Sequence, residues 1–198
     1  YYLFITEDGN NEEPLEESLW VEAAEEADRL GVDIFNTSLG YTEFDNPAYN
    51  HTYEDMNGTT AFISRGVNAA FSRGIISVNS AGNSGNSDWF YISAPADATY
   101  ALAVAAVNAS GNIASFSSRG PSFDGRVKPD VAAQGVASVL SNTDGDIVTA
   151  NGTSFSGPIT AGMVASLWQA LPSKTNAELI QLIKESSSQY TNPDYEKG

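Results

Sequence analysis

Cysteine is absent from the 198-residue chain, which excludes disulfide bonds, thiolate metal sites and a cysteine nucleophile. Histidine occurs once, at His51, so a catalytic group that needs two histidines cannot be built from these residues. No run of about 18 apolar residues is present, and the sequence therefore predicts no membrane span. Basic residues are scarce, with 9 Lys and Arg against 25 Asp and Glu, for a net charge of −16. Such an acidic chain repels phosphate backbones, so we expect no nucleic-acid partner.

Apolar residues make up 41% of the chain, enough to form the core of one domain. Helices are expected at Pro14–Leu30, Thr59–Arg73 and Thr153–Ala170, and a last helix is expected to open with the capping box at Thr175. Strands are expected at Tyr1–Thr6, Val32–Leu39, Ile75–Asn79, Ala101–Val107, Ile113–Ser118 and Val136–Leu140, with loops over residues 41–58 and 120–135. Because Tyr1 lies inside a strand-like run, we expect the chain to be an excerpt from a longer protein.

Apolar strands that alternate with helices favour an α/β fold with a mostly parallel sheet covered on both faces. The segment Thr153–Ala170 is apolar almost all round, which predicts a helix buried in the core. Parallel sheets place their functional sites at the carboxyl ends of the strands. Two loops of small residues are expected there, Asn36–Gly40 and Ser80–Asn83.

Ser154 stands at the expected start of the helix from Thr153 to Ala170. A helix N-terminus offers free N–H groups and a positive dipole end, which stabilise the negative charge that develops in acyl transfer. A nucleophilic serine is well placed there, although a serine at that position is also a common helix cap.

Five segments together resemble the subtilisin-like serine proteases (subtilases, peptidase S8 family). Gly152–Pro158 resembles the nucleophile motif G-T-S-x-[SA]-x-P, and Ala81–Gly85 resembles the oxyanion-hole loop A-G-N-x-G. The others are Asn36–Gly40 (N-x-S-L-G), Ala114–Pro121 (A-x-F-S-S-x-G-P) and Lys128–Ala133 (K-P-D-V-x-A), after which Gln134 replaces the usual Pro. All five occur in the order found in the family.

The resemblance implies a three-layer subtilisin-like fold in which Ser154 is the nucleophile and the Asn83 amide stabilises the oxyanion. It also implies that an extended protein or peptide substrate lies between Ser38, Leu39 and Gly40 on one side and Ala81 and Gly82 on the other. These loops carry no charge, which predicts a preference for apolar or aromatic side chains before the cleaved bond. No cofactor and no catalytic metal are required. Subtilases often carry structural calcium, for which the acidic turns at residues 7–10 and 144–146 are candidates.

The sequence departs from the family in one respect, because the motifs that supply the catalytic Asp and His are missing. His51 lies in a loop where the family has no catalytic histidine. We therefore interpret residues 1–198 as a partial catalytic domain that lacks the first strands and is inactive alone. The alternative is a protease-like domain without catalysis that binds peptides or serves as a scaffold. A lipase or esterase fits less well, because no G-x-S-x-G elbow surrounds Ser154.

Two further expectations concern the surroundings of the protein. Family habit and the acidic composition predict a secreted or cell-envelope protein. The segment Tyr1–Thr6 is apolar and has no charged residue to protect it, so we expect it to form an exposed sheet edge through which copies of the chain associate.

Overall fold

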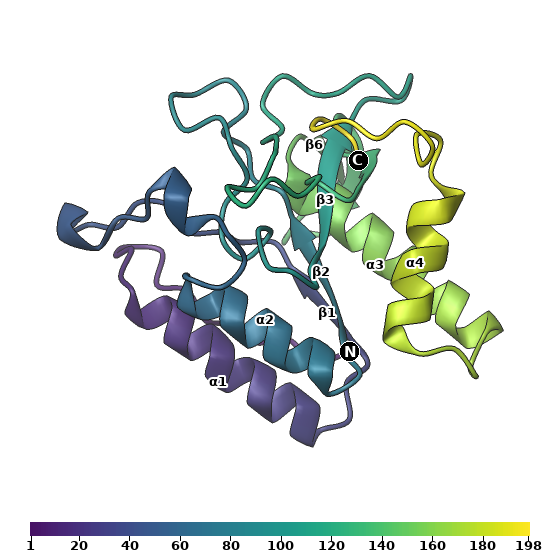
Figure 1. Cartoon of the computed structure of the whole chain (residues 1–198), viewed down its shortest axis with the longest axis horizontal. Coiled ribbons are helices and arrows are strands. Elements are labelled where there is room, and N and C mark those ends of the chain that lie inside the picture. The colour runs from purple at the N-terminus through teal and green to yellow at the C-terminus, as the bar shows by residue number, and fades with distance from the viewer.

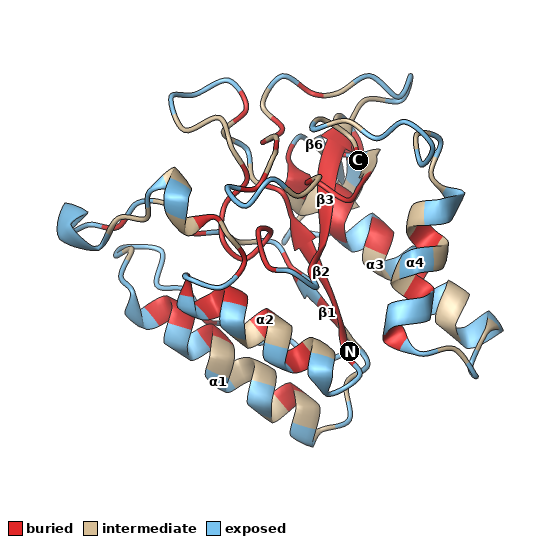
Figure 2. Cartoon of the chain, in the orientation of Figure 1, coloured by how far each residue is buried: buried red, intermediate tan, exposed pale blue.

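The computed structural model describes residues 1–198 and has a four-stranded parallel sheet at its centre. The strands lie in the order β1-β2-β3-β4, with bounds Ile34–Thr37, Ile76–Ser80, Leu102–Val107 and Val131–Gln134. Nearly every residue of β2 and β3 is buried, which explains why both read as continuous apolar or small-residue runs (Figure 2). The predicted parallel sheet is confirmed.

Helices cover both faces of this sheet (Figure 1). The helices α1 (Leu15–Arg29) and α2 (Phe62–Ser72) pack together on one face, and α3 (Thr153–Ala170) and α4 (Asn176–Ser186) lie on the other. Two separate apolar cores result. One core, around Trp20 and Ile63, lies between the sheet and the pair α1 and α2. The other core, around Val164 and Leu179, lies between the sheet and the pair α3 and α4. The three-layer α/β fold is therefore confirmed. None of its helices is long and apolar enough to cross a lipid bilayer.

The fourth strand and a small hairpin correct the sequence-based assignment. Residues 120–135 were expected to be a loop, but Val131–Gln134 pairs with β3 in the register Val104↔Val131. A run of four residues next to Pro129 was too short to stand out as a strand. The expected strand at Val136–Leu140 is β5 (Ser138–Ser141), which pairs antiparallel with β6 (Ile147–Ala150). The expected strand at Ile113–Ser118 is reduced to a single bridge between Val107 and Ile113.

The motif Lys128–Ala133 fixes β4 through buried charges. The Lys128 ammonium is almost completely buried and donates to Asp130 Oδ2 at 2.7 Å and to the Ala101 carbonyl at 2.8 Å. Lys184 of α4 donates to the other carboxylate oxygen of Asp130 at 2.7 Å. Burial alone would raise the pKa of Asp130, but the two ammonium groups hold it below its usual value. This motif therefore joins β4 to α4 and has a structural role.

The first six residues form no strand, contrary to expectation. The side chains of Tyr1, Leu3 and Ile5 are exposed, because no neighbouring strand pairs with this segment. It lies along a groove of about 970 Å³ that is also lined by α1, by β1 and by one side of α3. The strand β1, at one end of the strand order, is consequently an edge of the sheet with no strand paired on its outer side. Self-association through an edge stays a prediction.

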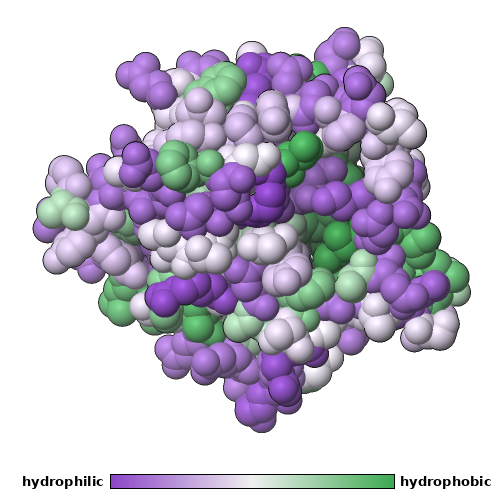
Figure 3. Space-filling view, viewed as in Figure 1, coloured by the Kyte–Doolittle hydropathy of each residue, from purple (hydrophilic) through white to green (hydrophobic).

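Helix α3 is buried on one side only. Thr160 and Val164 face the sheet, whereas Ile159 and Met163 are 51% and 44% exposed. The expectation of a buried helix therefore holds only for the face of α3 toward the sheet, since Ile159 and Met163 lie on a side that no other element covers. Hydrophilic residues, with apolar ones scattered among them, cover much of the face seen in Figure 3.

Candidate active site

Ser154 lies in the first turn of α3, as predicted from the sequence. The residue before the helix, Gly152, has φ +153°, a conformation that L side chains rarely adopt. The Ser154 hydroxyl donates to the Ser38 carbonyl at 3.4 Å, and the Ser38 hydroxyl donates to the Ser154 carbonyl at 3.2 Å. These reciprocal contacts place the proposed nucleophile directly beside the segment that follows β1.

Asn83 is held at the start of α3 by Thr153, the residue that precedes Ser154. The Thr153 N–H and hydroxyl donate to Asn83 Oδ1 at 2.9 and 3.0 Å. The acceptor end of the amide is thus used within the protein, and its Nδ2 donor end is left for another partner. Because the first N–H groups of a helix have no intrahelical acceptor, the Ser154 N–H is a second donor without a partner inside the helix. Two such donors are the groups that an oxygen carrying negative charge would need.

The two expected substrate loops extend from the carboxyl ends of adjacent parallel strands. Ser38–Gly40 follows β1, and Ala81–Gly82 follows β2. Ala81 is fully buried and Leu39 packs partly against the core, so these two residues anchor the loops. Ser38, Gly40 and Gly82 remain at least partly exposed.

Ser93 lies close to both loops, and no sequence motif pointed to it. A Cβ atom on Gly40 would collide with Ser93 Oγ, and one on Gly82 would lie 3.1 Å from the same oxygen. Ser93 is buried, and its backbone N–H donates to the Ala81 carbonyl at 3.3 Å. Ser93 thus explains the glycine at position 40, whereas at Gly82 the closest atom is Ser118 Oγ, 2.7 Å from an added Cβ, and φ is +108°.

Thr153 is the second residue whose role the sequence analysis missed. It stands inside the nucleophile motif, but its part in holding Asn83 depends on contacts across 70 residues of sequence. Its carbonyl also accepts a hydrogen bond from the Ser80 hydroxyl at 2.9 Å, so the start of α3 is fixed to the end of β2.

His51 does not reach this site. Its Nε2 lies 2.8 Å from Glu17 Oε1 of α1, and the Ser154 hydroxyl bonds only to the Ser38 carbonyl. Ser154 therefore has no imidazole or carboxylate partner among residues 1–198. A serine hydroxyl without such a base is a weak nucleophile at neutral pH.

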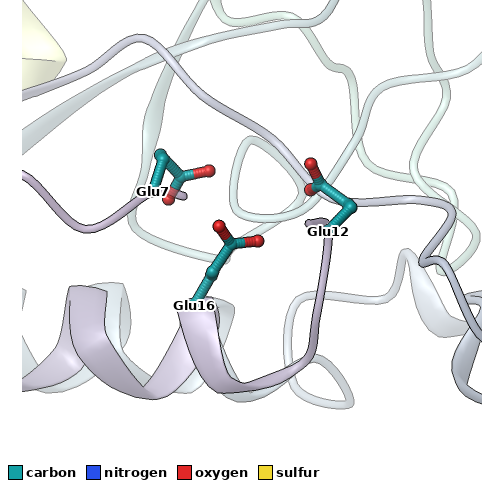
Figure 4. A group of neighbouring side chains, drawn as sticks. All are labelled: Glu7, Glu12 and Glu16. Atoms are coloured by element: carbon teal, nitrogen blue, oxygen red, sulfur yellow. The ribbon is translucent and has the colours of Figure 1, made fainter. Parts of the chain in front are cut away.

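A group of carboxylates lies at the start of α1 (Figure 4). Oxygens of Glu7, Glu12 and Glu16 come within 4.8 Å of one another. Glu16 accepts the backbone N–H groups of Asp8 and Glu13, at 2.7 and 3.1 Å, so it caps the turn that leads into the helix. Partial burial and the charges of Glu16 and Glu7 raise the pKa of Glu12.

The two acidic turns named as calcium candidates are closed by their own hydrogen bonds. The Asp8 carboxylate accepts from the side chains of Asn10 and Asn11, and Asn142 accepts the N–H groups of Asp144 and Asp146. Calcium binding stays a prediction of the resemblance.

The sequence profile of the Subtilase family matches residues 4–198. The chain belongs to the subtilase family. The serine protease AprX of Bacillus subtilis is 32% identical over 184 residues, which cover 82% of this chain and 39% of AprX. Subtilisin BL of Lederbergia lenta is 34% identical over 129 residues, covering 65% of this chain and 45% of that protein. The chain therefore spans less than half the length of these relatives.

Solved structures of subtilases share the fold of this chain. Sphericase superposes with a TM-score of 0.71 at 26% identity, covering 93% of this chain and 61% of that one. A cold-adapted subtilisin-like serine proteinase superposes with a TM-score of 0.69 at 23% identity and covers 91% of this chain and 60% of that one. The subtilisin-like fold class expected from the motifs is thus confirmed.

Proposed function

We propose that this chain is the nucleophile and oxyanion part of a subtilisin-type serine endopeptidase that acts outside the cytoplasm. The observation that carries the proposal is the pair of hydrogen bonds from Thr153 to Asn83 Oδ1, at 2.9 and 3.0 Å. They occupy the acceptor end of the amide and leave its donor end free for a substrate oxygen next to Ser154. A helix cap needs no such neighbour, so this arrangement favours catalysis over the simpler role of Ser154.

In the proposed reaction the Ser154 oxygen attacks the carbonyl carbon of a peptide bond while its proton passes to a base. The carbonyl oxygen becomes negatively charged and accepts hydrogen bonds from Asn83 Nδ2 and the Ser154 N–H. Collapse of this intermediate releases the amine with a proton from the same base and leaves an acyl group on Ser154. Water then releases the acid by the reverse sequence.

The base and the carboxylate that orients it are proposed to come from a part of the catalytic domain outside residues 1–198. The groove along β1 supports this assignment, because it reaches Ser38 and Leu39 and also borders α3 at Pro158. A segment that fills it would come close to Ser154. Residues 1–198 alone are then a partial catalytic domain and have no peptidase activity.

A fluorophosphonate reagent tests the proposal, because it labels only serines activated by a base. We expect the full-length protein to be labelled at Ser154, as located by mass spectrometry. The 198-residue chain should not be labelled under the same conditions. Labelling of the full-length protein at another serine, or no labelling at all, would contradict the assignment.

The lack of a base partner for Ser154 favours a second candidate, a protease-like domain that binds peptides without cleaving them. In that case the full-length protein resists the reagent but still binds peptides between the two substrate loops. Calorimetric titration with a substrate peptide distinguishes the two functions, since a pseudo-enzyme gives a stable binding signal with no later heat of hydrolysis.

Ser93 is proposed to limit the side chain that precedes the cleaved bond. An extended substrate between Gly40 and Gly82 would direct that side chain toward Ser93 Oγ. We expect Ser93→Gly in the full-length protein to raise kcat/KM for a phenylalanine substrate relative to an alanine substrate by about tenfold. Ser93→Ala removes Oγ but keeps Cβ, so it should raise the ratio by an intermediate amount. Equal ratios in all three proteins would show that the side chain binds elsewhere.

A further inference from the structure

His51 and Glu17 form a nearly buried pair away from the proposed active site. Their side chains are 13% and 4% exposed, and His51 Nε2 lies 2.8 Å from Glu17 Oε1. The other carboxylate oxygen, Oε2, accepts the Ile63 N–H at 2.8 Å in the first turn of α2. The N-cap residue of α2 makes no side-chain capping bond, so Glu17 supplies the acceptor at that helix end. Its carboxylate therefore connects three elements: α1, α2 and the loop of residues 41–58.

A continuous series of contacts leads from His51 to the substrate loop at Ser38–Gly40. The imidazole packs edge-on against Phe44, with ring centroids 5.5 Å apart, and Phe44 stacks on Tyr41 at 5.9 Å. Tyr41 follows Gly40 and is almost completely buried. Its N–H donates to the Ala94 carbonyl at 2.8 Å, and the Ala94 N–H donates to the Tyr41 carbonyl at 3.3 Å. The position of His51 is therefore coupled to that of residues 38–40 and of Ser93, the neighbour of Ala94.

The charge of His51 depends on pH in the physiological range. Burial alone would lower the pKa of His51, but the hydrogen bond and charge of Glu17 raise it above its usual value, with smaller contributions from Asp55 and Asp97. All three groups that raise the pKa of His51 are acidic, and they belong to α1, to the 3₁₀ turn Tyr53–Asp55 and to the loop before β3. Loss of the proton would leave the buried Glu17 carboxylate without a cationic partner.

The direction of the pH effect follows from the raised pKa of His51 in the folded state. The stabilisation is complete below the pKa of an unfolded histidine, about 6.5, and is lost as the pH rises through the higher pKa of the folded state. A neutral imidazole can still donate one hydrogen bond to Glu17, but it no longer balances the charge.

We propose that the His51–Glu17 pair is a pH-sensitive clasp that positions the substrate loop at residues 38–40. With His51 protonated, the clasp holds residues 41–58 against α1 and α2 and keeps Tyr41 paired with Ala94. With His51 neutral, the pairing of Tyr41 with Ala94 opens more often. His51 acts through Phe44 and Tyr41 and is a positioning residue. Only the effect on substrate rests on the proposed function, since the clasp itself is a property of the fold.

Hydrogen exchange measured by NMR tests the clasp without any catalysis. The Tyr41 and Ala94 amides report on the coupled segment, and the Ile76 amide, which donates to the Asp33 carbonyl at 3.0 Å, serves as the internal reference. From about pH 6 to about pH 9 we expect the protection of Tyr41 relative to Ile76 to fall about three- to tenfold. Because the 198 residues contain one histidine, its ring resonance gives the titration midpoint directly. The fall in protection should follow that midpoint.

Two variants and one control separate the effect of the clasp from general stability. His51→Gln keeps a donor but no charge, so the relative protection of Tyr41 should be low at every pH. Glu17→Gln keeps an acceptor for Ile63 and should bring the titration midpoint of His51 down. Tyr49→Gln, at an exposed position in the same loop, should leave the pH profile unchanged. Protection of Tyr41 that is independent of pH in the unmodified protein, or that follows pH equally in His51→Gln, would overturn the proposal.

A catalytic measurement on the full-length protein gives the functional consequence. If the proposed function holds, KM should rise above the His51 midpoint with kcat nearly unchanged, and His51→Gln should have the high KM throughout. A full-length protein without peptidase activity contradicts the proposed function and leaves the exchange result to decide the clasp. An active protein in which KM does not follow His51 contradicts the positioning role.

Discussion

Ser154→Ala in the full-length protein should abolish peptide hydrolysis and leave the fold intact. The substitution removes the atom that attacks the peptide carbonyl, and no other hydroxyl lies at this helix start with the same access. We expect kcat to fall by at least about 10³-fold. In subtilisin itself, a member of this family, removal of the triad serine costs on the order of 10⁶, a value that comes from that enzyme and not from this chain. The measurement is the steady-state rate with a chromogenic peptide.

Ser166→Ala is the matched control for this prediction. Ser166 lies on the same helix, is exposed, and donates only to the Gly162 carbonyl one turn earlier. Its replacement should leave the rate within about twofold of the unmodified protein, since exposed substitutions of this kind have small effects. A Ser154→Ala protein that keeps its rate would remove Ser154 from the mechanism, whatever the control shows.

The sheet and the helices could be predicted because their signals are local. The capping box at Thr175 and the apolar run of β3 each lie within a single segment. The wrong predictions concern segments whose structure depends on whether a neighbouring strand pairs with them. Tyr1–Thr6 has the composition of a strand but no neighbour to pair with, whereas Val131–Gln134 has a weak signal and becomes a strand through its register with β3.

The residues of the candidate site likewise fall into those that a local motif identifies and those that depend on contacts between distant parts of the sequence. Motifs identified Ser154 and Asn83, because each motif is a run of adjacent residues. Contacts across long sequence separations were not accessible, and these include Thr153 with Asn83, Ser93 below the two glycines, and His51 with Glu17. No periodicity connects such pairs, since only the folded arrangement of strands, helices and loops brings them together.

The amide of Asn83 provides the second large effect, because its two ends have different roles. Its oxygen accepts two hydrogen bonds from Thr153, and its nitrogen is proposed to donate to the oxyanion. Asn83→Asp preserves the acceptor and replaces the donor with a charged oxygen. We expect this variant to keep its stability in urea unfolding, because both bonds from Thr153 can still form.

Catalysis by Asn83→Asp should nevertheless fall by at least about 10²–10³ in kcat, with a smaller change in KM. The magnitude is that measured for the corresponding donor in subtilisin, and the negative charge of the new carboxylate adds repulsion of the oxyanion. Asn83→Ala should lose a similar factor in rate and in addition about 1–2 kcal/mol of stability, since Thr153 then loses its acceptor. Asn86→Asp, an exposed change of the same kind in the same loop, is the matched control and should behave like the unmodified protein. If Asn83→Asp retains the full rate, the nitrogen of Asn83 does not face the reacting carbonyl, and the oxyanion must be stabilised by the backbone N–H of Ser154 and by groups outside residues 1–198.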